Sequence, residues 1–217
     1  MGENRSSNND KRHKIAEALA SEIACGRIKP EHRLVEAQLG GRFGVKRNSV
    51  RQVLRDLEQD GFVKIVPNVG ATVASLSQKD IEQTYDLLGV IEGLAVRVIT
   101  PFVTPEQIEK LEGLLIKMES TNIPSQFLDF NVEFHSLISS WSENDRLIKL
   151  RESLRRNQMR FGIYSFFSPG QMTASRLDHR RIFDAMKSGK AVEAERLMRA
   201  HLLHAKNRLI KYMNKSL

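Results

Sequence analysis

The sequence has few of the residues that build disulfide frameworks or thiolate metal sites. Its 217 residues include one cysteine, Cys25, which excludes an internal disulfide and leaves no cysteine cluster for zinc. We expect Cys25 to be a small buried residue on the first helix of a protein in the reducing cytoplasm. No apolar run approaches the roughly 20 residues that span a bilayer, and the N-terminus lacks a signal-peptide pattern, so no membrane partner is predicted.

Acidic residues are missing from one stretch of a chain that otherwise has many. Between Ala37 and Arg55 there are five basic residues and no acid, although the chain has 26 acidic residues. Net charge does not locate this bias, because residues 1–76 (13 basic, 9 acidic) and residues 77–217 (21 basic, 17 acidic) each carry +4. The local cluster predicts a surface that faces a polyanion, with a solvated helix face as the alternative.

The acid-free stretch contains the pattern of a helix-turn-helix. The segment GVKRNSVRQVLRDL predicts a helix from near Lys46, with three arginines four apart on one face and an apolar face of Val50, Val53, Leu54 and Leu57. The preceding LVEAQLGGRFGV predicts a shorter helix that packs beneath it through Leu34, Val35, Leu39 and Phe43. Gly44 supplies the tight turn between the two helices. This arrangement is typical of a helix that enters a DNA major groove.

A β-hairpin is predicted directly after this helix. In FVKIVPNVGATVASL, two β-branched runs flank a tip of residues 67–70, and a hairpin in this position is a wing. Ahead of the helix-turn-helix, an amphipathic helix is predicted from Lys11 to Gly26, and residues 1–10 are predicted to be a disordered leader. Residues 11–76 are therefore predicted to form a winged helix-turn-helix domain.

From Ser77 onward the sequence predicts helices only. The first carries an apolar pattern that includes Leu94 and Val98, and Thr104 opens the second with Gln107 in its first turn. Further helices are predicted over residues 124–140, 144–166, 170–187 and 191–213. The predicted fold class is mainly α: a winged helix-turn-helix with a small hairpin wing, followed over residues 77–217 by an all-helical, effector-binding bundle of about six helices.

Four polar side chains on three of these helices have the chemistry of a metal site. Asn131 and His135 lie four apart in NVEFHSLI, and His179 and His201 lie in two later helices. Three imidazoles and an amide oxygen can hold a divalent ion with coordination positions left open. Spacing alone does not separate such a site from ordinary core or surface histidines.

The order of elements and the local strings resemble a GntR-family transcriptional regulator with an all-helical FCD effector domain. The resemblance covers residues 11–210 and is carried by GRIKPEHRLVEAQLGGRFGVKRNSVRQVLRDLEQDGFVKIVPNVGATV and by the histidine positions of the bundle. It implies that the protein is a homodimeric transcriptional repressor. It also implies that the protein is not an enzyme. Its implied partners are double-stranded operator DNA and a small effector, possibly a carboxylate, bound at or near a metal.

The resemblance also implies roles for individual residues. Positions that match operator contacts are Arg47, Asn48, Ser49 and Arg51, with Lys46 at the helix start and Gly70 at the wing tip. Positions that match the family's site for a divalent metal ion, such as zinc or nickel, are Asn131, His135, His179 and His201. Arg47 and Arg51 are the candidates for reading bases, since an arginine fork pairs with guanine O6 and N7.

Departures and alternatives remain at this stage. Leu88 stands where the family usually has an arginine, and Asn131 where many relatives have Asp. His204 is an alternative ligand, and a response to metal alone or a metal-dependent hydrolase using Glu133 are alternative functions. Four arginines either line an anion pocket or form a solvated face: Arg151, Arg155, Arg156 and Arg160. Aromatic side chains are expected in the core or a dimer contact: Trp141, Phe161, Tyr164, Phe166 and Phe167.

Overall fold

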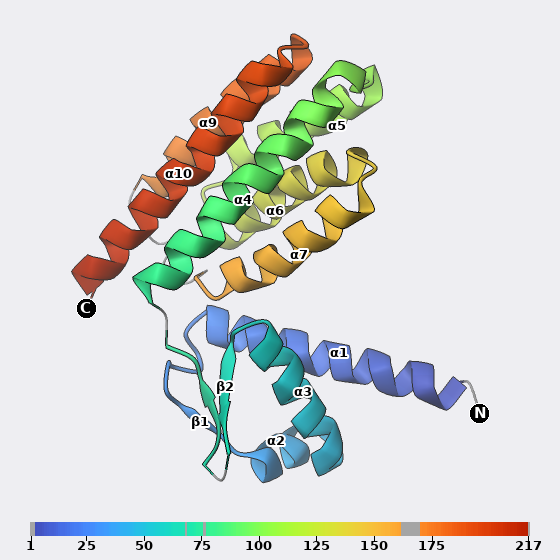
Figure 1. The fold of residues 1–217 in the computed structure, drawn as a ribbon, viewed down its shortest axis with the longest axis vertical. Helices are drawn as coiled ribbons and strands as arrows, with labels where there is room; N and C mark the ends of the chain where they lie inside the picture. The colour runs from blue at the N-terminus through green and yellow to red at the C-terminus, as the bar shows by residue number, and fades with distance from the viewer. Residues whose placement is uncertain (1–2, 68, 76, 162–169, 217) are drawn as a thin grey trace. The chain divides into compact units, whose positions relative to one another are not determined.

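The computed structural model describes residues 3–67, 69–75, 77–161 and 170–216 (Figure 1). Its contacts divide the chain into two compact units. One holds the residues up to Ser77 together with the end of helix α7 (Asp145–Met159) from Arg156 onward, and the other holds the remaining residues from Gln78. The sequence pattern placed the division beside Ser77, but it did not indicate that the end of α7 would join the first unit.

The first unit is a winged helix-turn-helix, which confirms the predicted fold. Its helices are α1 (Glu3–Ala24), α2 (Glu36–Phe43) and α3 (Arg47–Gln59). Its strands are β1 (Arg33–Leu34), β2 (Val63–Val66) and β3 (Gly70–Val73), which form an antiparallel sheet in the order β1-β3-β2. The predicted hairpin is β2–β3, with Val66 opposite Gly70, and β1 adds a strand that the sequence pattern did not indicate.

The core of this unit explains the orientation of α3. The four apolar residues predicted on one face of α3 are buried and pack with Leu19 of α1, Leu39 of α2 and Phe62 before β2. Gly44 ends α2 in a left-handed conformation (φ 60°), as the tight turn requires. Gly40 allows the close packing of this turn, because a Cβ there would lie 3.1 Å from the carbonyl oxygen of Val45. The opposite, basic face of α3 is thus held outward.

Three expectations for this unit differ from the structure. Helix α1 begins at Glu3, within the segment expected to be a disordered leader, because polar residues can extend a helix that its apolar part has nucleated. Leu34 lies in β1 and Val35 precedes α2, so neither belongs to the second helix. Cys25 follows the end of α1 and is exposed rather than buried.

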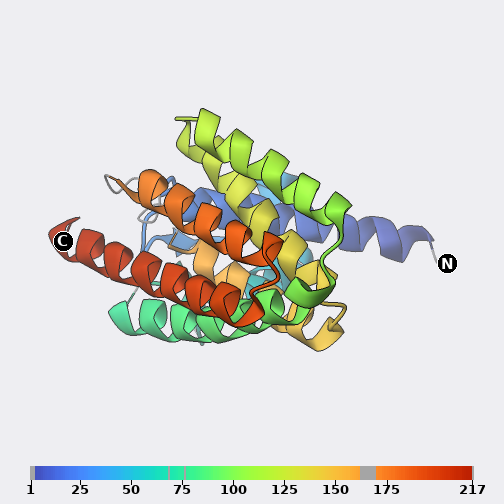
Figure 2. The same cartoon turned by 90° about the horizontal axis from the view of Figure 1, so that it is seen from above.

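The second unit is all-helical in the described residues, as predicted. It contains α4 (Gln78–Ile99), a 3-10 turn (Thr100–Phe102), α5 (Pro105–Ser120), α6 (Pro124–Trp141), most of α7, α9 (Gln171–Lys187) and α10 (Ala191–Ser216). Figure 2 shows α10 running beside α4 along much of its length. The helix predicted over residues 144–166 ends at Met159. Tyr164, Phe166 and Phe167 lie outside the described residues.

Local signals account for the helix boundaries, but the buried face of α4 was only partly predicted. Thr104 and Gln107 form the reciprocal hydrogen bonds of a capping box at the start of α5. On α4, Leu94 and Val98 are exposed instead of buried, and with Leu87 and Val90 they form a second apolar stripe. A helix with two apolar faces satisfies the same periodicity as one with a single wide face. No described helix is apolar over a length that would cross a bilayer.

Candidate DNA-binding surface and metal centre

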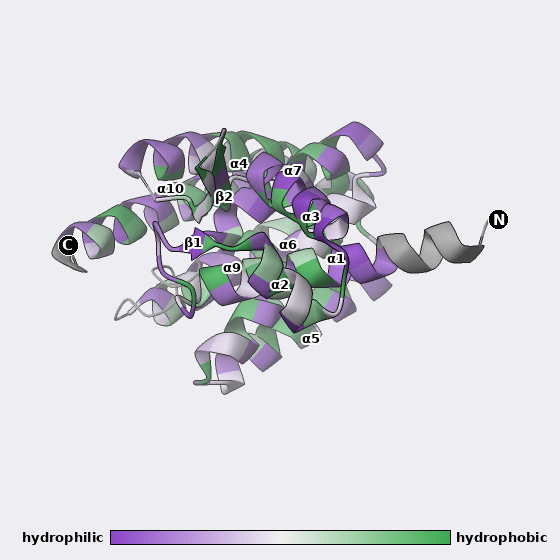
Figure 3. Cartoon of the chain, turned by 90° about the horizontal axis from the view of Figure 1, so that it is seen from below, coloured by the Kyte–Doolittle hydropathy of each residue, from purple (hydrophilic) through white to green (hydrophobic). Residues whose placement is uncertain are grey.

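The start of α3 is exposed and has no side-chain cap. Lys46 is the N-cap residue, and Arg47, Asn48 and Ser49 form the first turn. Lys46, Arg47 and Asn48 are exposed and Ser49 is half-buried. No side-chain hydrogen bond caps this end of the helix. The N–H groups of Ser49 and Val50 donate to the carbonyl oxygen of Lys46, and among the described residues those of Arg47 and Asn48 are available to an anion. Much of α3 is drawn in hydrophilic purple in Figure 3.

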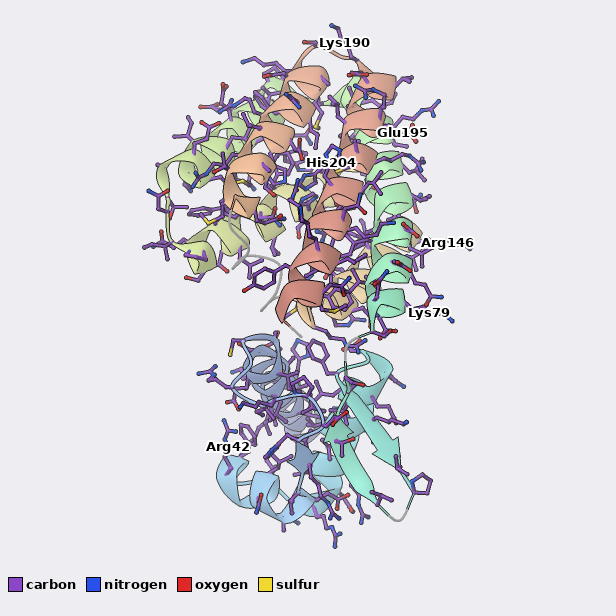
Figure 4. All side chains as sticks on the ribbon, turned by 90° about the vertical axis from the view of Figure 1, so that its left-hand side faces the viewer. Arg42, Lys79, Arg146, Lys190, Glu195 and His204 are labelled. Carbon is purple, nitrogen blue, oxygen red and sulfur yellow. The ribbon has the colours of Figure 1, made fainter. Side chains whose placement is uncertain are left out.

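The two candidate base-reading arginines are paired with an acid that the sequence pattern left out. Glu36, the first residue of α2, lies just before the acid-free stretch. Its carboxylate accepts a hydrogen bond from Nε of Arg47 and from Nε of Arg51, the latter at 3.0 Å. These contacts lower the pKa of Glu36 and keep it ionised. Arg42, labelled in Figure 4, instead pairs with Glu22 of α1.

Arg33, a basic residue on β1 beside the wing tip, was not identified as a candidate from the sequence pattern. Gly70 begins β3 with φ 112°, a conformation that favours glycine. Beside it, Nη2 of Arg33 on β1 donates a 2.8 Å hydrogen bond to the carbonyl oxygen of Val69. Arg33 could be recognised only once β1 is known to pair with β3, since the wing tip is distant in sequence.

In the second unit, three of the four predicted metal ligands come together. His135 of α6, His179 of α9 and His201 of α10 are buried, and one nitrogen from each lies within 4.8 Å of the others. Nε2 of His135 is 3.2 Å from Nε2 of His179. Ligand nitrogens on a tetrahedral ion are about 3.3 Å apart, given metal–nitrogen bonds of about 2.0–2.1 Å. The spacing of this pair therefore fits a bound divalent ion.

Two carboxylates face the outer nitrogens of this cluster. Oε2 of Glu92 on α4 lies 2.5 Å from Nδ1 of His135, an ion-pair distance. Oδ2 of Asp178 lies 3.4 Å from Nδ1 of His201. Carboxylates in these positions orient a histidine so that Nε2 is presented to a metal. Neither acid could be recognised from the sequence, because neither shares a helical turn with the histidine it contacts.

Burial also sets the protonation of the cluster. Burial alone would raise the pKa of Glu92, but the adjacent His135 and Arg151 lower it to about 2. Burial and the two neighbouring histidines hold the pKa of His179 well below its ordinary 6.5. Burial lowers the pKa of His201 as well, with Asp178 acting in the opposite direction. Neutral imidazoles are the form that binds metal.

Two other candidate ligands are less clearly placed. Asn131 is half-buried on α6, one helical turn before His135, and its role as a ligand stays a prediction. The side chain of His204, labelled in Figure 4, is about half exposed, with Nδ1 3.7 Å from Asp178. His204 therefore differs from the three buried histidines.

The four arginines on and beyond α7 form neither an anion pocket nor a uniformly solvated face. Arg151 is buried and donates to Glu92, Ser136 and Glu152. Arg155 also pairs with Glu152. Arg156, which belongs to the first unit, pairs with Asp60 at the end of α3. Arg160 donates to the carbonyl oxygen of Ser75 and lies over the Phe161 ring.

Family models match both units of the chain. The family described as "Bacterial regulatory proteins, gntR family" matches residues 11–73, and the FCD domain matches residues 83–204. The chain belongs to the gntR family of regulators with an FCD domain. It is accordingly a DNA-binding transcriptional regulator, as the sequence resemblance implied.

Relatives of this gntR-family chain are similar over most of its length. The HTH-type regulator YdhC of Bacillus subtilis is 29% identical over 190 residues, which cover 86% of this chain and 85% of YdhC. The HTH-type transcriptional repressor RspR of Escherichia coli is 25% identical, covering 87% of this chain and 84% of RspR. The solved structure of E. coli McbR/YncC has a TM-score of 0.77 at 18% identity, covering 93% and 97% of the two chains.

The described residues place Leu88, Glu133 and Glu92, which bear on the alternatives left open by the sequence. Leu88, where the family usually has an arginine, is fully buried in the core. Glu133, the acid considered for hydrolysis, is exposed, whereas the buried acid Glu92 is engaged by His135 and Arg151. Neither acid is thus positioned as a free general base.

We predict that the metal-free protein loses stability as the pH falls below about 6.5. His179 and His201 have lowered pKa values in the fold, so the unfolded state binds protons that the folded state does not. Each histidine then contributes a slope of up to about 1.4 kcal/mol per pH unit. Urea unfolding at pH 7.5, 6.5 and 5.5 measures this, and a flat profile would contradict it.

Proposed function

We propose that this regulator represses transcription by binding a pseudo-palindromic operator as a homodimer in the cytoplasm. We further propose that a small carboxylate effector, bound near a metal in the FCD domain, changes operator affinity by shifting the population of two arrangements. The observation that supports the DNA-binding part is that α3 presents Arg47 and Arg51 outward while its opposite face is buried.

Within the DNA-binding surface, residues at the helix start and on its face have different proposed roles. Arg47 and Arg51 reach guanines, which gives discrimination, and Asn48 and Ser49 offer short donors to base edges or phosphate. Lys46 and the backbone at Gly70 contact phosphate, which adds affinity without reading sequence. The name of RspR, a repressor, supports the sign of regulation.

These roles predict different results for two substitutions. Arg51→Ala should lower the preference for operator over shuffled DNA by about 1–3 kcal/mol. Lys46→Ala should weaken binding to both duplexes alike and reduce the salt slope by about 1. Fluorescence anisotropy over a salt series, on a duplex selected from a random pool by the wild type, distinguishes the two. Arg196→Ala, an exposed arginine of α10, is the matched control. If the wild type selects no sequence, the proposal is wrong.

The three buried histidines, with Asn131 as a further candidate, would hold the metal. A bound divalent ion would supply positive charge and open coordination positions for a carboxylate. This matters because Leu88 offers no charge and Arg151 is already paired with Glu92. A structural relative with a TM-score of 0.58 is described as the metal-free FCD domain of TM0439. A metal titration of operator binding with and without organic acids tests whether metal alone is the signal.

The exposed apolar stripe of α4 supports the dimer. Leu87, Val90, Leu94 and Val98 are each about half exposed on one helix face. Asp86 and Arg97, near the ends of this stripe, are paired within the chain with Lys206 and Glu195 of α10. Two antiparallel copies of α4 would cover the apolar residues across a two-fold interface. A second copy also supplies the second recognition helix that a palindrome needs.

We predict that Leu94→Glu makes the protein monomeric and lowers operator affinity at least about 100-fold, because two linked half-site contacts become one. Sedimentation equilibrium gives the oligomeric state, and anisotropy gives the affinity. Ile116→Glu, on a more exposed isoleucine of α5, should change neither quantity. A wild-type monomer at micromolar concentration, or a dimeric Leu94→Glu variant, would rule out this interface.

A further inference from the structure

We propose that Glu36 determines the DNA specificity of this protein by holding both base-reading arginines at Nε. The inference rests on the proposed role of α3 in operator binding and adds a residue to which no DNA contact has been assigned. Glu36 is not on the recognition helix, and its negative charge by itself disfavours DNA.

The geometry shows one carboxylate shared by two guanidinium groups. Arg51 Nε lies 3.0 Å from Oε1 and 3.1 Å from Oε2 of Glu36, and Arg47 Nε contacts Oε2. Glu36 is the least exposed of the three side chains, at 26% against 69% for Arg47 and 49% for Arg51. The acid therefore lies behind the arginines, between α2 and the start of α3.

This pairing leaves the outer edges of both guanidinium groups available. Within the part of the chain that the structure describes, neither arginine makes a hydrogen bond through its terminal nitrogens. The Nη1–Nη2 edge of a guanidinium can pair with O6 and N7 of guanine. Because Nε is held from behind, each arginine loses less side-chain freedom when that edge binds a base.

The negative charge of Glu36 also favours specific over non-specific DNA binding. A carboxylate beside the DNA surface repels phosphate on every sequence, so it weakens non-specific binding. The benefit of held arginines arises only where guanines occupy the matching positions. The charge of Glu36 thus weakens binding to every sequence, and the held arginines strengthen binding to the matching sequence alone. Together these effects raise the ratio of operator affinity to non-specific affinity, which is how a repulsive group contributes to recognition.

The test compares Glu36→Gln with Glu17→Gln, which removes the same charge from an exposed site on α1. Binding to the wild-type-selected duplex and to a shuffled duplex of equal length is measured by anisotropy at three salt concentrations. Glu36→Gln should bind the shuffled duplex several-fold more tightly and should lower the ratio of the two affinities about tenfold, the size of one lost bidentate contact. Glu17→Gln should keep the wild-type ratio.

A second variant separates position from charge. Glu36→Asp keeps the charge, but its side chain is one methylene shorter and its carboxylate is withdrawn from both Nε atoms, so it should also lower the ratio. An unchanged ratio in Glu36→Gln, or equal losses on both duplexes, would overturn the proposal while leaving operator binding intact. Failure of the wild type to select any duplex would instead refute the proposed function. Circular dichroism melting confirms that each variant is folded before binding is measured.

Discussion

Replacing Glu92 by alanine is expected to lower the free energy of unfolding of the helical unit by about 3–5 kcal/mol. Glu92 is buried and lies between the guanidinium of Arg151 and the ring of His135. Removing it leaves Arg151, itself 3% exposed, with the more exposed Glu152 as its acidic partner. The pKa of Glu92 is lowered to about 2 by His135 and Arg151, which indicates that the carboxylate is ionised at neutral pH.

The chain contains a convenient probe for this measurement. Trp141, its single tryptophan, ends α6 in the helical unit, so its fluorescence during urea unfolding reports on that unit. Glu193→Ala removes an exposed acid of α10 as the control and should leave the urea midpoint close to that of the wild type. The double variant Glu92→Leu with Arg151→Met should be less destabilised than Glu92→Ala, because no buried charge remains. A loss below about 1 kcal/mol in Glu92→Ala would contradict this expectation and show that Glu152 and Ser136 are sufficient partners for Arg151.

Local patterns were enough to predict the first unit. The buried face of α3, the glycine turn before it and the two wing strands each depend on residues within a few positions of one another. Their order along the chain then identified the winged fold. The strand β1 was missed because two residues carry no periodicity, and they are ordered only by pairing with β3.

The contacts that orient the arginines of the DNA-binding surface and the histidines of the metal centre were not predictable from local patterns. Glu92 and Arg151 are 59 residues apart in sequence, and Glu36 reaches its arginines from another helix. A sequence pattern gives the face of a helix on which a residue lies, but not the residue opposite it in another helix. The histidines were found because the family resemblance supplied the positions; the acids that orient them needed the packing of α4, α6, α9 and α10.

Replacing His179 by phenylalanine is expected to weaken divalent metal binding by more than about 100-fold. His179 is fully buried, and its Nε2 lies 3.2 Å from that of His135. Loss of a ligand should exceed the 10- to 100-fold effect that even second-shell residues have on affinity. Zinc and nickel affinities can be measured by competition with a chromophoric chelator. His204→Phe, at the half-exposed neighbour of the site, should retain wild-type affinity and is the matched control.

The same substitution should have the opposite effect on the metal-free protein. Nδ1 of His179 is buried without a hydrogen-bond partner among the described residues, which costs stability. A phenylalanine has no such atom and would pack against Phe134, whose ring centroid lies 4.7 Å from that of His179. Metal-free His179→Phe should therefore unfold at higher urea than the metal-free wild type and lose less stability at pH 5.5. A histidine retained only for packing would show no gain of this kind, and zinc would then stabilise variant and wild type equally.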